Sequence, residues 1–248
     1  MDTIVSIPRE GISDQLFVSV GSEGTIVGID PVLHPGRVLQ FGPDGRIVAE
    51  ADVSRLPSPG IPFFNLEGEI LIPDERYGMV QVLTPALEPV GTFMTVENLQ
   101  VALVLPSGDM VVNALSTTPA RVRYALHLVT PGDDRLMSMD RPDMRLLTLG
   151  NSFRLKRFLA LRDRTSFWSA HATTYRIDHW DVSGRLVESL RRDAPWFEGR
   201  ETRSLARLEP PPADLVGLDS DSEGRLWVLF SVSDLEWKGS WTPTWALS

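Results

Sequence analysis

Four polar side chains stand where short apolar runs end: Asp30, Asp74, Asn113 and His171. The runs before them read Thr-Ile-Val-Gly-Ile, Glu-Ile-Leu-Ile-Pro, Asp-Met-Val-Val and Phe-Trp-Ser-Ala. Carboxylate and amide oxygens are the ligands that hard divalent cations prefer, so these side chains offer metal chemistry in principle. Short Asp and Asn side chains at such places also accept hydrogen bonds from nearby backbone amides. We favour that structural role for them.

The four runs belong to a repeat, because a short turn that ends in glycine precedes most of them. Gly24, Gly68 and Gly108 are 44 and 40 residues apart, and Gly224 begins a further copy. A copy without the glycine ends at His171. A period of about 40 to 50 residues is typical of propeller blades. The longer interval before Gly224 holds two copies only if one carries an insertion.

Each copy continues into a hairpin. Residues 37–41 lead through Asp44-Gly45 into 46–50, and residues 175–180 lead through Ser183-Gly184 into 185–190. Asp-Gly is a strong hairpin signal, because glycine tolerates positive φ and Asp bonds its own backbone. Residues 79–83 and 121–126 are the corresponding strands of the second and third copies. Alternation with a period of two predicts strands over nearly the whole chain.

These copies predict an all-β fold, a β-propeller of about five or six four-stranded blades. The propeller is either incomplete or closed by pairing of the chain ends, residues 4–7 with 241–247. We expect one domain over residues 1–248. The predicted repeats cover approximately residues 13–56, 60–97, 98–142, 143–196 and 213–248, with an irregular linker at 197–212. Trp168, Trp180 and Trp227 are expected to pack between blades.

The succession of turn glycine, apolar strand, Arg-Val strand and Asp-Gly hairpin resembles the six-bladed propeller repeats of the NHL and related families. Residues 24–50 match best, and residues 68–92 match less well. The resemblance implies ligand binding or scaffolding more often than catalysis, although lactonases and lyases are among the relatives. In gluconolactonase-like propellers a central divalent cation is held by oxygen ligands. We predict no cofactor, with one divalent cation such as Ca²⁺ as the alternative.

The function that we favour is a binding or interaction module whose ligand, a peptide, a glycan or a partner protein, lies across one face. Asp30, Asp74, Asn113 and His171 would converge on that face, and Arg76 and Tyr77 are candidate anchors in a neighbouring loop. An ordinary role as exposed loop residues is the simpler interpretation of Arg76 and Tyr77. The alternative function is a metal-dependent hydrolase or lactonase. An incomplete ring would favour a homodimer.

Composition limits the partners. The chain of 248 residues has a formal net charge of −9, which disfavours nucleic acid and anionic membrane surfaces. It has no cysteine, so disulfides and thiolate sites are excluded. No stretch of about 18 apolar residues predicts membrane insertion. No signal peptide is visible, so we expect a cytoplasmic protein, or an extracytoplasmic one if a leader has been lost.

Overall fold

The structure of the protein is a computed structural model of the chain. It describes residues 12, 16–21, 24–30, 36–53, 55–114, 124–133, 136–142, 155–197, 213–221, 223–232 and 244–247. These residues form strands and turns, without an α-helix. In this part of the chain there is accordingly no helix long and apolar enough to cross a membrane.

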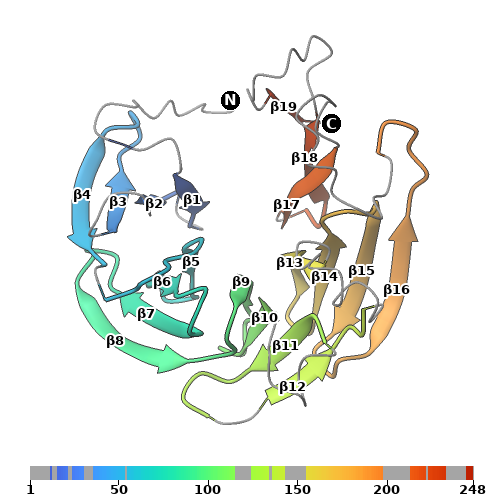
Figure 1. Cartoon of the computed structure of the whole chain (residues 1–248), viewed down its shortest axis with the longest axis horizontal. Helices are drawn as coiled ribbons and strands as arrows, with labels where there is room; N and C mark the ends of the chain where they lie inside the picture. Colours follow the sequence, from blue (N-terminus) through green and yellow to red (C-terminus); the bar gives the residue numbers. More distant parts are fainter. Residues whose placement is uncertain are drawn as a thin grey trace. The chain divides into compact units, whose positions relative to one another are not determined.

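The described strands form five sheets, and hydrogen-bonded neighbours follow one another in chain order in every sheet. The first sheet consists of β1 (Phe17–Val20), β2 (Ile26–Asp30), β3 (Arg37–Phe41) and β4 (Ile47–Asp52), and the second of β5 (Phe63–Phe64), β6 (Ile70–Pro73), β7 (Met79–Leu83) and β8 (Pro89–Met94). The third consists of β9 (Leu99–Val104), β10 (Met110–Ala114), β11 (Leu126–Val129) and β12 (Leu136–Met139). Figure 1 shows β2 and β3 between β1 and β4, the arrangement expected of one blade.

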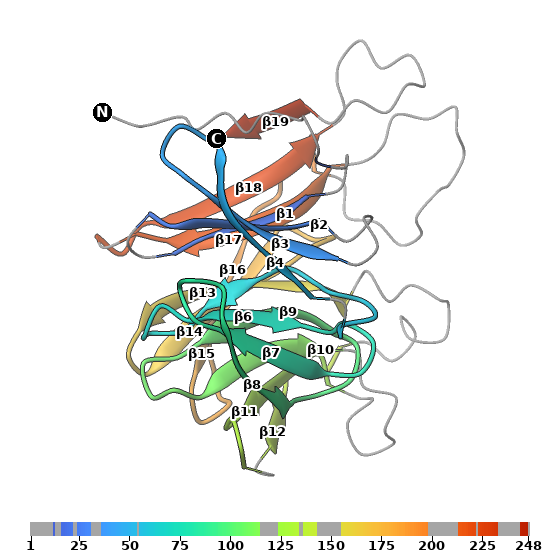
Figure 2. The same cartoon turned by 90° about the vertical axis from the view of Figure 1, so that its left-hand side faces the viewer.

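The fourth sheet consists of β13 (Arg157–Asp163), β14 (Ser166–His171), β15 (Arg176–Asp181) and β16 (Leu186–Arg191). The fifth has three strands, β17 (Asp214–Ser220), β18 (Leu226–Val232) and β19 (Thr244–Leu247). In Figure 2, β18 lies between β17 and β19. Each of these two sheets is antiparallel throughout, as expected for strands joined by hairpins.

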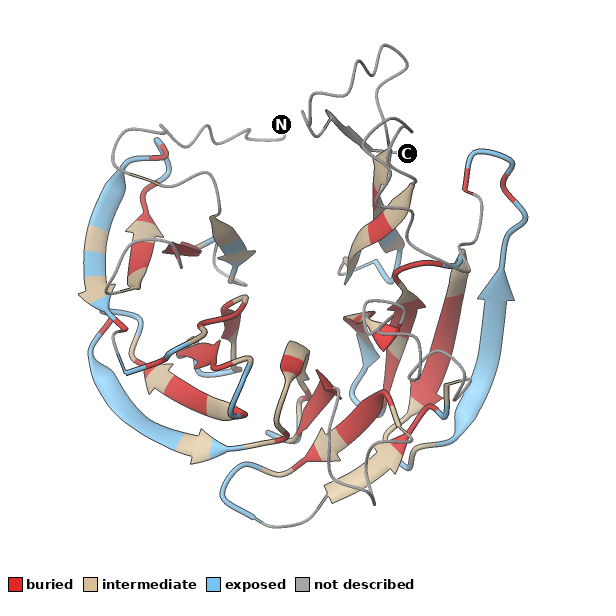
Figure 3. Cartoon of the chain, viewed as in Figure 1, coloured by how far each residue is buried: buried red, intermediate tan, exposed pale blue. Residues whose placement is uncertain are grey.

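The chain divides into two compact units, which are described separately. Unit 1 contains residues 1–116 and 129–135, and unit 2 contains residues 117–128 and 136–248. In unit 1 the inner faces of the first two sheets share a core. Its buried members are Val27, Ile29, Val38, Val53, Leu56, Ile70, Ile72, Leu83 and Leu87. Strands β4 and β8 are largely exposed, so the core lies on the middle strands (Figure 3).

The core of unit 2 contains a group of aromatic side chains. Tyr175 stacks on Phe230 with ring centroids 5.1 Å apart, and Phe197 meets both rings edge-on. The buried residues Ala170, Ile177, Ala194 and Leu215 complete this cluster. Offset-stacked and edge-to-face pairs are favourable arrangements of aromatic rings. The cluster fixes the turn between β14 and β15, where Tyr175 lies.

The turn glycines that define the repeat have left-handed backbone conformations. Gly24, Gly68, Gly108 and Gly224 have φ values of 78°, 77°, 87° and 76°. A residue with a Cβ atom is strained in this region, whereas glycine is not. The hairpin glycines Gly45 and Gly184 adopt the same conformation. The recurring glycine is therefore explained by backbone geometry.

Some expectations need correction or fall outside the described residues. In the third sheet Tyr124 and Ala125 of the predicted strand 121–126 precede β11, which begins at Leu126, and residues 121–123 lie outside the described residues. Trp168 packs between the fourth and fifth sheets as expected and Trp180 is buried, but Trp227 is 54% exposed and donates a hydrogen bond to Asp221 at 2.9 Å. The linker at 197–212 lies outside the described residues except for Phe197, and residues 4–7 lie outside them entirely. The proposed domain and repeat boundaries stay a prediction.

Candidate functional site

Three of the predicted site residues lie in unit 1 and are fully buried. Asp30 ends β2, Asp74 follows β6 directly, and Asn113 is the fourth residue of β10; each has an exposed fraction of 0%. The Asp74 carboxylate accepts hydrogen bonds from the backbone amides of Ser58 at 3.0 Å and Tyr77 at 2.7 Å. It also accepts one from the Arg76 amide at 3.0 Å. Asp74 thus closes its own loop.

Arg76 and Tyr77 lie on the exposed side of that loop. Tyr77 is 51% exposed, and the Arg76 guanidinium lies 5.3 Å from the centre of its ring. The guanidinium and the ring are therefore within the distance of a cation–π contact. Nothing beyond this exposure marks either residue as a ligand anchor, and that role stays a prediction.

Asp30, Asp74, Asn113 and His171 are also the candidate ligands of the alternative metal site. Among the described residues, no three His, Asp or Glu side chains are grouped in a way that could hold a metal ion. His171 belongs to unit 2, and the other three candidates belong to unit 1. A site that gathers all four therefore stays a prediction of the sequence.

His171 instead lies in an open pocket of unit 2 with a volume of about 600 Å³. The pocket is formed by the end of β12, the ends of the four strands of the fourth sheet, and the turn after β14. Its lining consists of Asp140, Arg141, Pro142, Arg157, His171, Thr173, Thr174, Tyr175, Arg176, Arg191, Arg192, Asp193 and Phe197. The described part of unit 1 has a smaller pocket of about 140 Å³, with Glu67 as its one charged lining residue.

The register of the fourth sheet places four basic residues in one row. Arg157 on β13 is the cross-strand partner of His171 on β14, and Arg176 on β15 is the partner of Arg191 on β16. His171 and Arg176 lie next to the Ala170–Ile177 pair, on its side toward the turn of the β14–β15 hairpin. Cross-strand neighbours project to the same face of a sheet. The row therefore presents its side chains to the pocket, which all four line.

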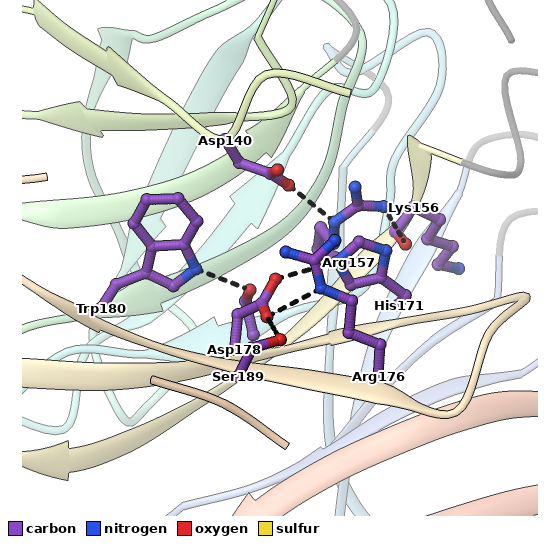
Figure 4. Close-up of polar contacts among 9 residues, drawn as sticks. Asp140, Lys156, Arg157, His171, Arg176, Asp178, Trp180 and Ser189 are labelled. Carbon is purple, nitrogen blue, oxygen red and sulfur yellow. Dashed lines mark hydrogen bonds and ion pairs between the residues drawn. The ribbon is translucent and has the colours of Figure 1, made fainter. Parts of the chain in front are cut away.

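Asp178 lies beneath this row and neutralises part of its charge. Its carboxylate accepts hydrogen bonds from Arg176 Nε at 2.8 Å, Ser189 Oγ at 2.6 Å and His171 Nε2 at 3.1 Å (Figure 4). The Asp178 side chain is completely buried. Burial alone would raise the pKa of the carboxyl, but these hydrogen bonds lower the pKa of Asp178 to about 2. Asp178 is therefore ionised at neutral pH.

A second buried ion pair fixes the inner end of the row. Arg157 Nε donates to Asp140 Oδ2 at 2.8 Å, and both side chains are almost fully buried. Asp140 follows β12 with a left-handed φ of 57°, a conformation that Asp tolerates better than most residues. Burial lowers the pKa of Arg157, and the Asp140 carboxylate opposes that effect. The pair holds the Arg157 guanidinium at the pocket wall.

His171 is neutral at pH 7. Burial, and next the positive charge of Arg157, lower the pKa of the His171 imidazole below its ordinary value of 6.5, although Asp178 opposes the shift. An ionised carboxylate only accepts hydrogen bonds, so Nε2 carries the ring proton and Nδ1 has the lone pair. His171 is thus an oriented, neutral imidazole that lines the pocket.

The outer part of the pocket is more exposed. Arg191, Arg192 and Asp193 are exposed, and the Arg192 guanidinium lies 5.9 Å from the centre of the Tyr175 ring. Arg141 donates two hydrogen bonds to the hydroxyl of Tyr124, at 2.7 and 3.2 Å. Several of these guanidinium groups face solvent and can change partners.

Sequence reasoning found His171 but missed most of its neighbours. Arg176 and Asp178 alternate with the apolar Ile177, so they share one face of β15. A charged pair on the inward face of a strand indicates a buried polar network, and this signal was available. The contribution of Asp140 was not, because that residue comes from another sheet.

No protein-family model matches the chain, and no curated protein matches it at a significant level. The fold is nevertheless similar to solved structures. A catalytically inactive variant of virginiamycin B lyase from Staphylococcus aureus with quinupristin superimposes with a TM-score of 0.59 at 12% identity, covering 88% of this chain and 65% of the lyase. A streptogramin B lyase gives a TM-score of 0.59 at 15% identity, covering 93% and 67%.

A luciferin-regenerating enzyme is similar as well, with a TM-score of 0.51 at 13% identity over 86% of this chain and 67% of that enzyme. This chain therefore spans about two thirds of the length of these structures. At such low identity the likeness bears on the fold alone. Together with the four-stranded sheets in chain order, it shows that the chain has the β-propeller fold.

Proposed function

We propose that this β-propeller is a ligand-binding module and that the pocket of unit 2 is its binding site. The observation that carries the proposal is the open pocket of about 600 Å³, whose wall is held by buried, paired charges. Binding sites combine a concave surface with a few polar groups that are fixed in position. Peptides, glycans and partner proteins remain candidate ligands at the exposed rim.

The rigidity of the wall supports this assignment. The side chains of Arg157 and Asp140 are only 2% and 7% exposed, and the Asp178 carboxylate is completely buried. Their geometry is therefore set before any ligand arrives, which reduces the conformational entropy lost on binding. Buried ion pairs are also weak sources of stability, because desolvation offsets much of their attraction. A binding role accounts for the presence of buried ion pairs at this place.

The experiment is a ligand screen by thermal shift and ligand-observed NMR on the wild type and on a blocked variant. Thr174 is exposed and lines the pocket, so Thr174→Trp fills it without changing the buried network. Leu186→Trp is the matched control, because Leu186 is exposed on β16 and does not line the pocket. We expect ligands to lose binding in Thr174→Trp alone. Ligands that bind Thr174→Trp as well as the wild type would place the site elsewhere.

A second candidate function is acid–base catalysis in the same pocket. The specific observation is the 3.1 Å contact of His171 with Asp178, together with the lowered pKa that keeps the imidazole ready to accept a proton. Lyases of the same fold make an enzyme a reasonable alternative. The metal-dependent hydrolase predicted from the sequence has no support from a cluster of ligands in the described residues.

These two functions are separated by His171→Gln. For each ligand from the screen, mass spectrometry would show whether the protein converts it during prolonged incubation. If the protein is an enzyme, the wild type would convert the ligand, and the His171→Gln variant would bind the ligand without converting it. A binding module would leave the ligand unchanged in both proteins.

A further inference from the structure

Two arginines in the basic row face each other across strands. Arg176 and Arg191 are direct partners in the β15–β16 pair, and like charges in such positions destabilise a sheet. Arg176 is compensated by Asp178 at 2.8 Å. Within the described residues, neither Arg191 nor Arg192 forms an ion pair with a carboxylate. The exposed end of the row therefore carries positive charge that no carboxylate of the described residues compensates.

The pocket differs in charge from the rest of the chain. Its described lining residues include five arginines and two aspartates, whereas the whole chain has 24 Lys and Arg against 33 Asp and Glu. One sign of charge concentrated in a concave site raises the local concentration of ligands of the opposite sign. An acidic protein with a basic pocket thus selects for anions at that place.

An apolar wall adjoins the basic groups. The Tyr175 and Phe197 rings line the pocket with centroids 5.8 Å apart, and both are held by the aromatic cluster behind them. The Arg192 guanidinium lies beside the Tyr175 ring. An apolar wall next to guanidinium groups suits a ligand with an apolar body and an oxyanion, because guanidinium binds carboxylate and phosphate groups with paired hydrogen bonds.

We propose that the ligand is a small organic oxyanion, a carboxylate or a phosphate ester, whose apolar body is of aromatic size. The oxyanion would bind Arg191 and Arg192, and the body would lie against Tyr175 and Phe197. Charge-assisted hydrogen bonds of this kind are short and strong. This inference rests on the proposed binding function and specifies the chemical class of its ligand.

The test is isothermal titration calorimetry with matched probes. Benzoate and phenyl phosphate carry the anion and the body, benzamide keeps the body without the charge, and acetate and inorganic phosphate keep the charge without the body. We expect benzoate or phenyl phosphate to bind at millimolar concentration or below, more tightly than the probe that lacks either part. Added salt should weaken this binding, because the outer arginines are exposed.

The double variant Arg191→Gln/Arg192→Gln removes the exposed charges and keeps similar side-chain volumes. We expect its affinity for the anionic probe to fall about tenfold or more, since hydrogen bonds to charged groups are worth at least that much. Arg185→Gln is the control: Arg185 is exposed as well, pairs with Asp181 and lies outside the pocket lining. Its affinity should match the wild type. Unchanged melting temperatures would show that both variants are folded.

Several outcomes would overturn the inference. They are equal binding of benzamide and benzoate, unchanged affinity in the double variant, and no binding of any anionic probe at millimolar concentration. In the first case a ligand that loses binding in Thr174→Trp would still support the proposed binding function. The ligand class and the binding site can therefore fail independently.

Discussion

Asp74 in unit 1 and Asp178 in unit 2 are both completely buried carboxylates, but different groups satisfy them. Asp74 accepts hydrogen bonds from three backbone amides around one loop. Asp178 accepts them from three side chains, those of His171, Arg176 and Ser189. Backbone donors cannot leave without unfolding the loop, whereas side-chain donors belong to groups that also face a pocket.

The difference shows how a repeat can satisfy a buried carboxylate in two ways. In the copy that contains Asp74, the acidic residue after the second strand stabilises the fold locally. In the fourth sheet the corresponding position is His171, and the buried carboxylate, Asp178, lies on the next strand. Burial by itself therefore does not distinguish the two carboxylates, but the identity of their hydrogen-bond donors does.

The largest expected effect comes from breaking the buried pair beside Asp178. Arg157→Ala leaves the Asp140 carboxylate buried without its partner, and the free energy of unfolding should fall by about 3 to 5 kcal/mol. Urea unfolding at pH 7 measures this. Arg185→Ala, which breaks an exposed pair, should leave stability nearly unchanged. Similar losses in both variants would mean that burial of the pair has no special importance.

Asp74→Asn tests the structural side of the comparison. The amide keeps one acceptor oxygen but presents an NH₂ group to a backbone donor, so we expect a loss of about 2 kcal/mol. The calorimetric affinity for benzoate should not change, because Asp74 belongs to unit 1. A loss of benzoate affinity in a variant that remains folded would contradict the division of roles.

The Asp178 carboxyl should make stability depend on acid pH. Its pKa is about 2 in the folded protein against an ordinary value of 3.8, so ionised Asp178 stabilises the fold above about pH 4. This contribution, about 2 kcal/mol, is lost as the pH falls toward 2. Urea unfolding of wild type and Asp178→Asn over this range measures it. Parallel pH profiles of the two proteins would rule out Asp178 as the source.

His171 should cause a smaller change nearer neutrality. The pKa of His171 is lowered in the folded protein, so below pH 6.5 the unfolded chain binds the proton more readily. Stability therefore decreases as the pH is lowered. His171→Gln should therefore lose less stability than the wild type between pH 7 and pH 5. Urea unfolding of both proteins at the two pH values measures this difference. An unchanged slope would show that the imidazole is not held neutral by the fold.

Much of the fold was predictable from the sequence because its signals are local. The turn glycines at 24, 68, 108 and 224 mark positive φ values, which a single residue type reveals. Strands at 37–41 and 79–83 also agree with their apolar alternation. Of the strand predicted at 121–126, residues 121–123 lie outside the described residues, Tyr124 and Ala125 precede the strand, and Leu126 begins β11, which continues to Val129.

The candidate site was less predictable. Local sequence identified His171 as a polar residue at a strand end and grouped it, as a ligand-binding candidate, with residues that belong to unit 1. Side-chain partners depend on register: Arg157 faces His171 only because β13 and β14 pair as they do. A shift by one residue would turn Arg157 to the other face.

The sequence by itself determined the repeat, the hairpins and the β-propeller class, since turn chemistry and alternation act over a few residues. Tertiary structure decided which carboxylate meets which cation. Asp140 reaches Arg157 from a different sheet, across 17 residues of chain. The exposure of Trp227 was decided in the same way, by which surfaces the neighbouring strands cover. Such contacts arise from packing between sheets, and no local pattern encodes them.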